Sequence, residues 1–261
     1  MPRTPRRLAL TVALFAAVCA AIAGFGGVIA AAEPAATYTQ FTSAQRDEIV
    51  AIIRAAMKQD PSILRDAVAA LQADESRNEA SNQASLIAKL APELFRQDGD
   101  PMLGRPDAKV TVVEFSDVRC PYCRRMLPVL ADLLRTNKDV RIVYKDMPVL
   151  GPGSVLGARA ELAAQRQDGY EKLHQALMTG SNQITEDVIK AESIKAGLDW
   201  SRLRADMDRP DILARINANL ALAHQLDLKG TPAYVVGDTL LPGAVELSEL
   251  QNAVNAARAA N

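Results

Sequence analysis

The chain is poor in the residues that metal sites and nucleic-acid-binding proteins need. Among its 261 residues are three cysteines and two histidines, and its net charge is −1. A structural zinc site needs about four ligands, but Cys19 lies in an N-terminal apolar run, and His174 and His224 lie far along the chain from the other two cysteines. The near-neutral charge argues against a nucleic-acid partner and against electrostatic binding to a membrane surface. Aromatic residues make up only 4% of this alanine-rich chain, which favours a helix-rich architecture.

The other two cysteines stand one helical turn apart, after a predicted strand and a short loop. Val110–Phe115 is dense in β-branched residues, and a helical pattern begins at Cys120-Pro121-Tyr122-Cys123. Cys120 falls at the expected N-cap and Pro121 at the first helical position, where the missing N–H costs nothing. Because free amides and the positive end of the helix dipole point at the Cys120 sulfur, its thiolate is favoured. The pair is therefore predicted to cycle between dithiol and disulfide.

A purely structural disulfide is the alternative interpretation of this pair. A cross-link stabilises a fold more when it closes a longer loop, and the loop between Cys120 and Cys123 is nearly the shortest possible. The spacing therefore favours redox chemistry over structural bracing. The exchange needs only the two sulfur atoms, so we expect no cofactor and no metal site.

Two prolines and a carboxylate complete a pattern around the cysteines. Pro128 lies five residues beyond the second cysteine, Thr231-Pro232 precedes a strand-like apolar run, and Glu114 lies six residues before the first cysteine. With these marks, residues 101–261 resemble the bacterial DsbA-like branch of the thioredoxin superfamily. In that family a proline follows the CxxC at this spacing, a cis-proline loop faces the cysteines, and a buried acidic residue lies behind them.

The resemblance implies an α/β architecture, a thioredoxin fold with an inserted helical subdomain, preceded by an N-terminal helical segment. We expect the catalytic domain at residues 98–261, with the insertion at about residues 150–228. Four or five helical patterns fill that insertion, more than a minimal thioredoxin core accommodates. Tyr170 and His174 are expected to be packing residues within it.

The resemblance also assigns roles to the candidate catalytic residues. Cys120 is the expected nucleophile and Cys123 the residue that resolves the mixed disulfide. Glu114 has two interpretations. On a buried strand its pKa would be raised, which suits a proton shuttle for Cys123; alternatively, it pairs with Lys145 on the neighbouring strand. Arg124 is expected on the solvated face of the helix.

Four further residues are expected to contact the substrate: Pro121, Tyr122, Thr231 and Pro232. If the bond before Pro232 is cis, as the resemblance implies, the Thr231 backbone is free to pair with an extended substrate strand. Tyr122 carries no charge and cannot stabilise the thiolate as a cationic histidine would. Threonine before the proline resembles isomerase-type proteins more than the most strongly oxidising relatives.

The beginning of the chain predicts export. Three arginines within the first seven residues precede an uncharged run, residues 8–32, that ends in small residues. This pattern is typical of a secretory signal peptide, assigned to residues 1–32. The run is also long enough to be an uncleaved inner-membrane anchor, since about 20 apolar residues span a bilayer. Either way we expect the body of the protein in the oxidising periplasm, after a polar linker at residues 33–41.

Residues 42–97 are predicted to be helical and to associate with other copies of the chain. Apolar residues recur at helical spacing in two stretches, 43–58 and 61–71, while residues 72–85 show no sustained apolar stripe. Such amphipathic helices need a surface to pack on, either the catalytic domain of the same chain or another copy. ScsC-like members of the DsbA branch carry an oligomerisation segment of similar size and placement. We therefore expect a homo-oligomer, with dimer and trimer left open.

These observations leave two classes of function. The resemblance implies a thiol:disulfide oxidoreductase that acts on exported proteins with cysteines and is reset by a membrane redox partner. Within that class, disulfide isomerase and dithiol oxidase both remain open, with isomerase favoured. The other class is a Cu(I)-binding copper-tolerance module that uses the same two thiolates, because thiolates suit this soft ion.

Overall fold

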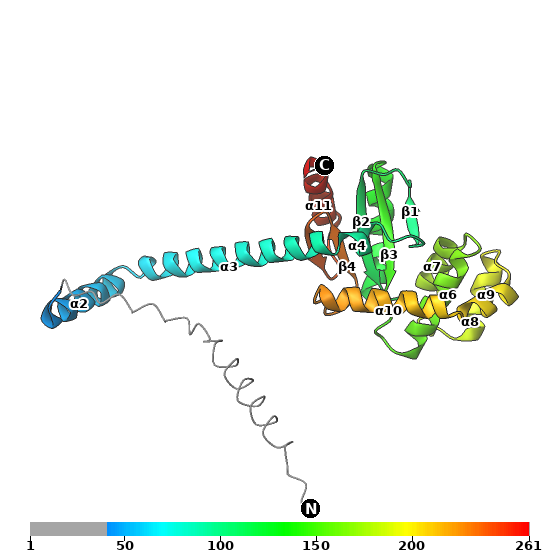
Figure 1. The fold of residues 1–261 in the computed structure, drawn as a ribbon, viewed down its shortest axis with the longest axis horizontal. Coiled ribbons are helices and arrows are strands. Elements are labelled where there is room, and N and C mark those ends of the chain that lie inside the picture. Colours follow the sequence, from blue (N-terminus) through cyan, green and yellow to red (C-terminus); the bar gives the residue numbers. More distant parts are fainter. Residues whose placement is uncertain (1–40, 261) are drawn as a thin grey trace, which may run out of the picture. The chain divides into compact units, whose positions relative to one another are not determined.

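The computed structural model describes residues 41–260 (Figure 1). The expected signal peptide or anchor at residues 1–32, and all but the last residue of the expected linker at 33–41, lie outside these described residues. Between residues 41 and 260, no helix combines the length and the hydropathy needed to cross a bilayer. The described chain forms two compact units, which divide between Val68 and Ala69.

The first unit is built from α2 (Ser43–Gln59) and the first turns of α3 (Ser62–Lys89). Thr42 caps α2: its side chain accepts a hydrogen bond from the Gln45 backbone, and the Gln45 side chain accepts one from the Thr42 backbone. None of the side chains of α2 is buried. Its exposed large apolar residues are Ile49, Val50, Ile52, Ile53 and Met57.

The continuous helix α3 is longer than the sequence pattern indicated. The polar stretch at residues 72–85 was expected to carry no stable apolar face, yet it is helical throughout. It contains neither glycine nor proline, and most of its residues have good helix propensity. In the second unit the chain then buries Ile87 near the end of α3, Leu90, and Leu94 in α4 (Ala91–Phe95).

A five-stranded mixed sheet forms the centre of the second unit, in the order β1-β3-β2-β4-β5. Its strands are β1 (Met102–Gly104), β2 (Val110–Ser116), β3 (Val140–Asp146), β4 (Ala233–Val236) and β5 (Thr239–Pro242). β2 and β3 are parallel and joined through α5 (Pro121–Thr136), the arrangement that a strand-helix-strand order along the chain favours. β1 pairs antiparallel with β3 at one edge of the sheet.

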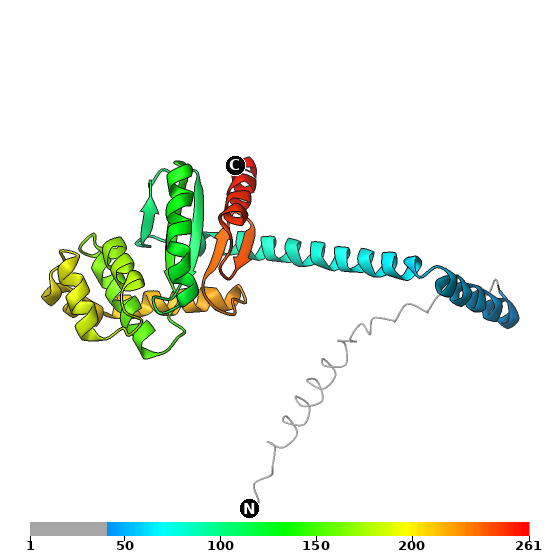
Figure 2. The same ribbon diagram turned by 180° about the vertical axis from the view of Figure 1, so that it is seen from behind.

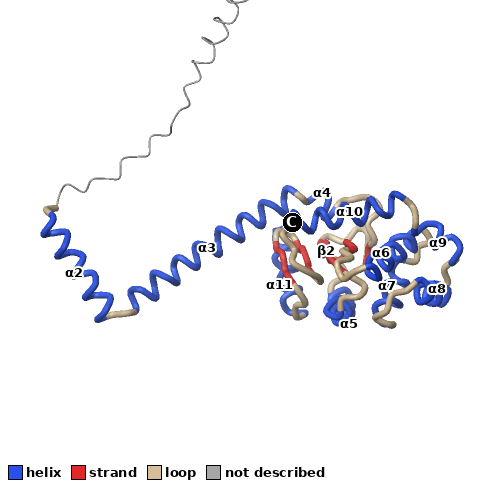
Figure 3. Tube along the Cα trace, turned by 90° about the horizontal axis from the view of Figure 1, so that it is seen from below, coloured by secondary structure: helices blue, strands red, loops and turns tan. Residues whose placement is uncertain are grey.

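Helices cover both faces of this sheet. Figure 2 shows α5 lying along one face, and in Figure 3 the strands lie between α5 and α11 (Leu247–Ala260) on one side and α4 and α10 (Pro210–Gln225) on the other. Alternate residues of each strand point to opposite faces of the sheet, and each face has its own apolar core. Val112 and Ile142 pack on the side of α5 and α11, whereas Val113 and Val143 pack on the opposite side.

The expected helical insertion follows β3 and confirms the predicted fold class. Its helices are α6 (Pro152–Gln165), α7 (Tyr170–Thr179), α8 (Glu186–Lys195), α9 (Trp200–Met207) and α10. α6 to α9 enclose a separate apolar core that contains Leu173, Leu177 and Met207, whereas α10 packs in the cores of the sheet. The two CxxC cysteines, Cys120 and Cys123, belong to this same core, so the insertion forms part of the cysteines' surroundings.

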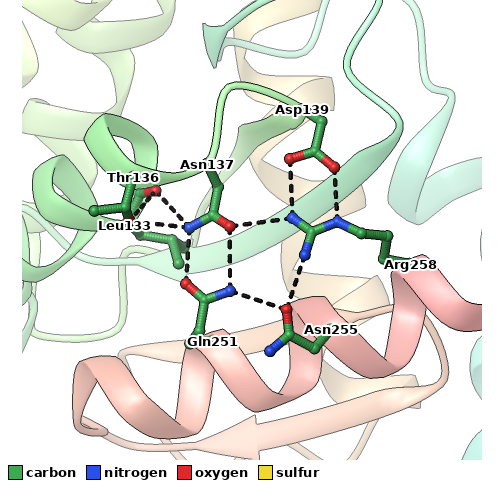
Figure 4. Close-up of polar contacts among 7 residues, drawn as sticks. All are labelled: Leu133, Thr136, Asn137, Asp139, Gln251, Asn255 and Arg258. Atoms are coloured by element: carbon green, nitrogen blue, oxygen red, sulfur yellow. Dashed lines mark hydrogen bonds and ion pairs between the residues drawn. The ribbon is translucent and has the colours of Figure 1, made fainter.

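A polar network fastens α11 to the end of α5 (Figure 4). Asn137 follows the last residue of α5, and its side-chain amide donates a hydrogen bond to Gln251 at 2.8 Å. Arg258 donates to both carboxylate oxygens of Asp139, at 2.7 and 2.9 Å, and to Asn137 at 3.1 Å. Asn255 accepts hydrogen bonds from Gln251 and Arg258. The network holds the far end of the cysteine-bearing helix against the C-terminal helix.

Candidate active site

Cys120 sits at the N-cap of α5, with Pro121 at the first helical position, as the sequence predicted. Cys120 and Cys123 are both free thiols. The pKa of Cys120 is lowered to about 5, chiefly by the hydrogen bond from the Cys123 thiol, with further contributions from the Thr231 side chain and from the backbone amides of Cys123 and Tyr122. In the thiol form its Sγ also donates to the Thr231 carbonyl at 3.2 Å. The thiolate form of Cys120 is therefore favoured at neutral pH.

Cys123 lies one turn further into the protein and behaves in the opposite way. The hydrogen bond with Cys120, burial and the charge of Glu114 all raise the pKa of its thiol. Its side chain is 1% exposed, against 4% for Cys120, so both sulfurs are largely covered. The two cysteines thus differ mainly in which one holds the negative charge.

Glu114 lies in the middle of β2, in register with Tyr144 on β3 and Tyr234 on β4. It is buried, and the Tyr234 hydroxyl donates to its Oε1 at 3.2 Å. Burial raises the pKa of Glu114 to about 7, while the nearby His174 and the Tyr234 hydroxyl act to lower it. A carboxyl group with this pKa, whose charge is felt by Cys123, is suited to exchange protons with that thiol.

The alternative pairing of Glu114 with Lys145 is wrong. Lys145 is in register with Phe115, so its side chain points to the opposite face of the sheet from Glu114. There the ammonium group donates to Asp100 at 2.5 Å and to the Glu93 carbonyl at 2.6 Å. The buried carboxylate near the cysteines and the buried lysine belong to different cores.

The Thr231–Pro232 peptide bond is cis, as the resemblance implied. The Thr231 carbonyl accepts the hydrogen bond from Cys120 Sγ, and Pro232 is buried. Residues 227–233 and parts of β5 line a cavity of about 340 Å³ beside them. Pro121 and Tyr122 are exposed on the helix turn between the cysteines, and the Arg125 guanidinium lies 4.5 Å from the centre of the Tyr122 ring. The structure therefore brings the four expected substrate residues to the surroundings of one sulfur.

Two arginines that flank the CxxC connect it to the helical insertion. Arg124 was expected on the solvated helix face, but it is partly buried and donates to the carbonyls of Leu177, at 3.0 Å, and Gly180, at 2.8 Å. Carbonyls at a helix C-terminus lack intrahelical partners, which makes them good acceptors for a guanidinium. Arg119 donates to the Leu150 carbonyl at 2.6 Å, in the loop after β3.

Sequence reasoning missed a buried polar cluster beside Glu114. Tyr170 donates to Asp146 at 2.8 Å, and His174 Nδ1 lies 3.0 Å from Glu161 Oε1. Tyr170 and His174 are buried, as expected of packing residues, but their polar contacts were not predicted. One signal was present in the sequence: Glu161 lies in the alanine-rich stretch of α6, on a helix with so little polar surface that a carboxylate there has no solvated face.

Within the described part of the chain, no three histidine, cysteine, aspartate or glutamate side chains are grouped in a way that holds a metal ion. A lowered pKa on one thiol, a raised pKa on its neighbour and a carboxyl group that titrates near neutrality suit a thiol–disulfide exchange.

Comparisons with known proteins agree with this geometry. Residues 111–255 match the family model of the DSBA-like thioredoxin domain, and residues 45–77 match the model of the copper resistance protein ScsC N-terminal domain. A thioredoxin-like oxidoreductase from Silicibacter pomeroyi DSS-3 is 45% identical, with a TM-score of 0.63, over 65% of this chain and 98% of that one. ScsC from Proteus mirabilis is 31% identical, with a TM-score of 0.63, over 85% of this chain and 98% of that one.

Some relatives are much longer than this chain. The Na(+)/H(+) antiporter NhaA 3 of Salinispora tropica is 28% identical over 162 residues, which cover 61% of this chain and 25% of the antiporter. The chain thus spans about a quarter of that relative's length.

Proposed function

Because this chain belongs to the DSBA-like thioredoxin-domain family of thiol-disulfide oxidoreductases, we propose that it rearranges disulfide bonds in exported proteins through Cys120 and Cys123. The opposite pKa shifts of the two thiols carry this proposal. A nucleophile of low pKa attacks readily at neutral pH, and it is also a good leaving group when the captured substrate is released.

The exchange follows from these two sulfurs and Glu114. The Cys120 thiolate attacks a substrate disulfide, forms a mixed disulfide and expels one substrate sulfur as a thiolate. Cys123 then loses its proton to the Glu114 carboxylate and attacks the Cys120 sulfur. The bond between the two cysteines forms, the bond to the substrate breaks, and the second substrate sulfur leaves as a thiolate. The protein dithiol has been oxidised and the substrate disulfide reduced; the reverse sequence forms a disulfide in the substrate.

Alkylation by iodoacetamide across a pH series tests the proposal. The full chain in its reduced form is expected to react at Cys120 with a midpoint near pH 5, because the thiolate is the reactive species. The Cys123→Ala variant removes the largest cause of that low pKa, so its midpoint should rise towards the value of about 8.5 for a free cysteine. A wild-type midpoint near 8.5, with both thiols equally reactive, would contradict the assignment.

We further propose isomerase rather than oxidase activity, in the periplasm, with a membrane redox partner that resets the pair. The uncharged Tyr122 between the cysteines supports a less oxidising couple, since no cationic side chain there adds to the stabilisation of the thiolate. The cavity beside Thr231 and Pro232, together with the exposed Tyr122 ring, is suited to an unfolded peptide segment. The N-terminal arginines and the uncharged run at residues 8–32 support export.

The exposed apolar residues of α2 support self-association of the chain. Ile52 and Ile53 are 60% and 47% exposed, and α2 buries no side chain within its own chain. A uniformly exposed row of large apolar side chains marks an association surface. An oligomer would hold several CxxC pairs together, which suits repeated reduction and reoxidation of one substrate.

A charge-insertion variant tests this association. The Ile52→Glu/Ile53→Glu double variant is expected to weaken assembly at least about a hundredfold, because each buried isoleucine contributes about 1.5–3 kcal/mol. Light scattering over a concentration series should then give the mass of one chain where the wild type gives a multiple. The Ser76→Glu/Asn78→Glu variant adds the same charge to exposed positions of α3 and should keep the wild-type mass. A monomeric wild type, or equal masses for both variants, would refute the association.

A further inference from the structure

Two buried polar atoms near the resolving cysteine have no hydrogen-bond partner among the described residues. One is Glu114 Oε2, on β2; the other is His174 Nε2, on α7. Both side chains are about 2% exposed, and each appears among the charged groups that act on the other. A buried donor or acceptor left unsatisfied costs about 1–3 kcal/mol. The two atoms are not hydrogen-bonded to each other, so a buried water that bridges them removes both costs.

The surroundings of His174 decide which of its nitrogens carries the proton. Its Nδ1 lies 3.0 Å from Glu161 Oε1. Burial raises the pKa of Glu161 to about 8 and lowers the pKa of His174, so both groups are neutral at pH 7. A neutral Glu161 carboxyl donates its proton to Nδ1, which leaves the hydrogen of the imidazole on Nε2. His174 is then a donor at the atom that lacks a partner.

Other titratable groups surround Glu114 and His174. Glu114 is faced by Tyr144 and Asp146 from β3, by Tyr234 from β4 and by both cysteines from α5. The Tyr234 hydroxyl already donates to Oε1, and Asp146 is an acid whose pKa is raised well above its ordinary value and which accepts from Tyr170.

The remaining charges act on Glu161 and His174. The pKa of Glu161 responds to Asp146, Asp117 and Arg124. The pKa of His174 responds to the charges of Glu114, Asp146 and Glu171. Asp146 Oδ2 is a third buried atom of this cluster without a hydrogen-bond partner in residues 41–260. One buried water that accepts from His174 Nε2 and donates to Glu114 Oε2 and Asp146 Oδ2 satisfies all three atoms.

We propose that His174 is a positioning residue for Glu114: its Nε2 donates to one buried water, which in turn donates to Oε2 of the carboxylate, in the tautomer that Glu161 selects. This inference rests on the proposed function, in which Glu114 takes the proton of Cys123. The hydrogen bond stabilises the ionised carboxylate and so keeps Glu114 able to accept that proton at neutral pH. Glu161 on α6 and His174 on α7 thus keep the Glu114 carboxylate ionised, so the inserted helices contribute to the chemistry of the thioredoxin core.

The pH dependence of the resolution step tests the proposal. Full-length reduced protein is mixed with excess oxidised glutathione, and loss of the Cys120–glutathione mixed disulfide is followed by rapid acid quench and mass spectrometry. In the wild type the rate should rise with a midpoint near pH 7, the pKa of Glu114. In His174→Phe the midpoint should rise by about one unit, which makes resolution about tenfold slower at pH 6 and unchanged at pH 9.

Matched variants separate this role from a structural one. His174→Gln keeps an N–H donor and should restore most of the wild-type profile, whereas Glu161→Gln also donates to Nδ1 and should leave it unchanged. Leu173→Ala weakens the same helix without altering these polar groups, so it should lower the unfolding midpoint but not move the pH profile. A shift in Leu173→Ala equal to that in His174→Phe, or no shift in His174→Phe, would overturn the proposal.

A measurement on the wild type covers the case in which a variant fails to fold. Imidazole ¹⁵N NMR at pH 7 should show His174 with a protonated Nε2 and a bare Nδ1; His224 is the second of only two histidines in the chain, which makes the assignment direct. A proton on Nδ1 alone would overturn the proposal. If wild-type Cys120 ionises like a free cysteine, the proposed function fails; if resolution proceeds normally and only the His174 predictions fail, the proposed function stands.

Discussion

Cys120→Ser is expected to lower insulin-reduction activity by at least about a thousandfold while the protein remains folded. The attacking group must be a thiolate, and a serine hydroxyl does not ionise at neutral pH. The substitution replaces one small buried atom at a helix N-cap, where serine is a favourable residue. The midpoint of thermal unfolding should therefore change little. Turbidity of reduced insulin, with dithiothreitol as the electron source, measures the activity.

Cys123→Ser is the matched control for this substitution. It retains the attacking sulfur but lacks the group that resolves the mixed disulfide, so a covalent complex with the substrate should accumulate on non-reducing gels. Cys120→Ser should form no such complex. If Cys120→Ser retains activity, or if the wild type binds Cu(I) tightly but shows no exchange, the oxidoreductase proposal must be abandoned for the metal-binding one.

The parts of the site that sequence reasoning predicted depend on local signals. Proline after Cys120 and the β-branched run before it determine where the strand ends and the helix begins, so the N-cap position of Cys120 was predictable. The parallel pairing of β2 and β3 follows from one strand-helix-strand unit. Burial of Glu114 follows from its place inside an apolar strand.

The parts that were missed depend on partners distant in the sequence. Arg124 donates to the carbonyls of residues more than 50 positions away in the sequence. No local sequence pattern indicates which carbonyls lie next to its guanidinium in the folded chain. The alternative pairing of Lys145 with Glu114 depended only on their strands being adjacent, but a register offset of one residue places the two side chains on opposite faces of the sheet. His174 was interpreted as packing because its partner Glu161 is contributed by a different helix.

Asp100→Ala is expected to destabilise the protein by about 3–5 kcal/mol, the usual cost of leaving a buried charge without its counterion. Lys145 is fully buried, and its ammonium group donates to Asp100, to the Glu93 carbonyl and to the Gln97 side chain. Asp100 is the carboxylate among these partners, and it also accepts from Arg215 at 2.8 Å. Lys145→Met should cost less, because Asp100 then keeps Arg215. Urea unfolding at pH 7 measures both.

The pH dependence and the double variant make this prediction specific. Burial already lowers the pKa of Lys145 below its ordinary 10.5, and loss of Asp100 should lower it further. Between that lowered folded-state pKa and 10.5 the unfolded chain binds more protons, so the stability of Asp100→Ala should rise with pH and its deficit should shrink towards pH 10. Asp100→Leu/Lys145→Met removes both charges and should be clearly more stable than Asp100→Ala. A deficit that is independent of pH, or a double variant as unstable as Asp100→Ala, would show that lost packing rather than an unpaired ammonium group causes the effect.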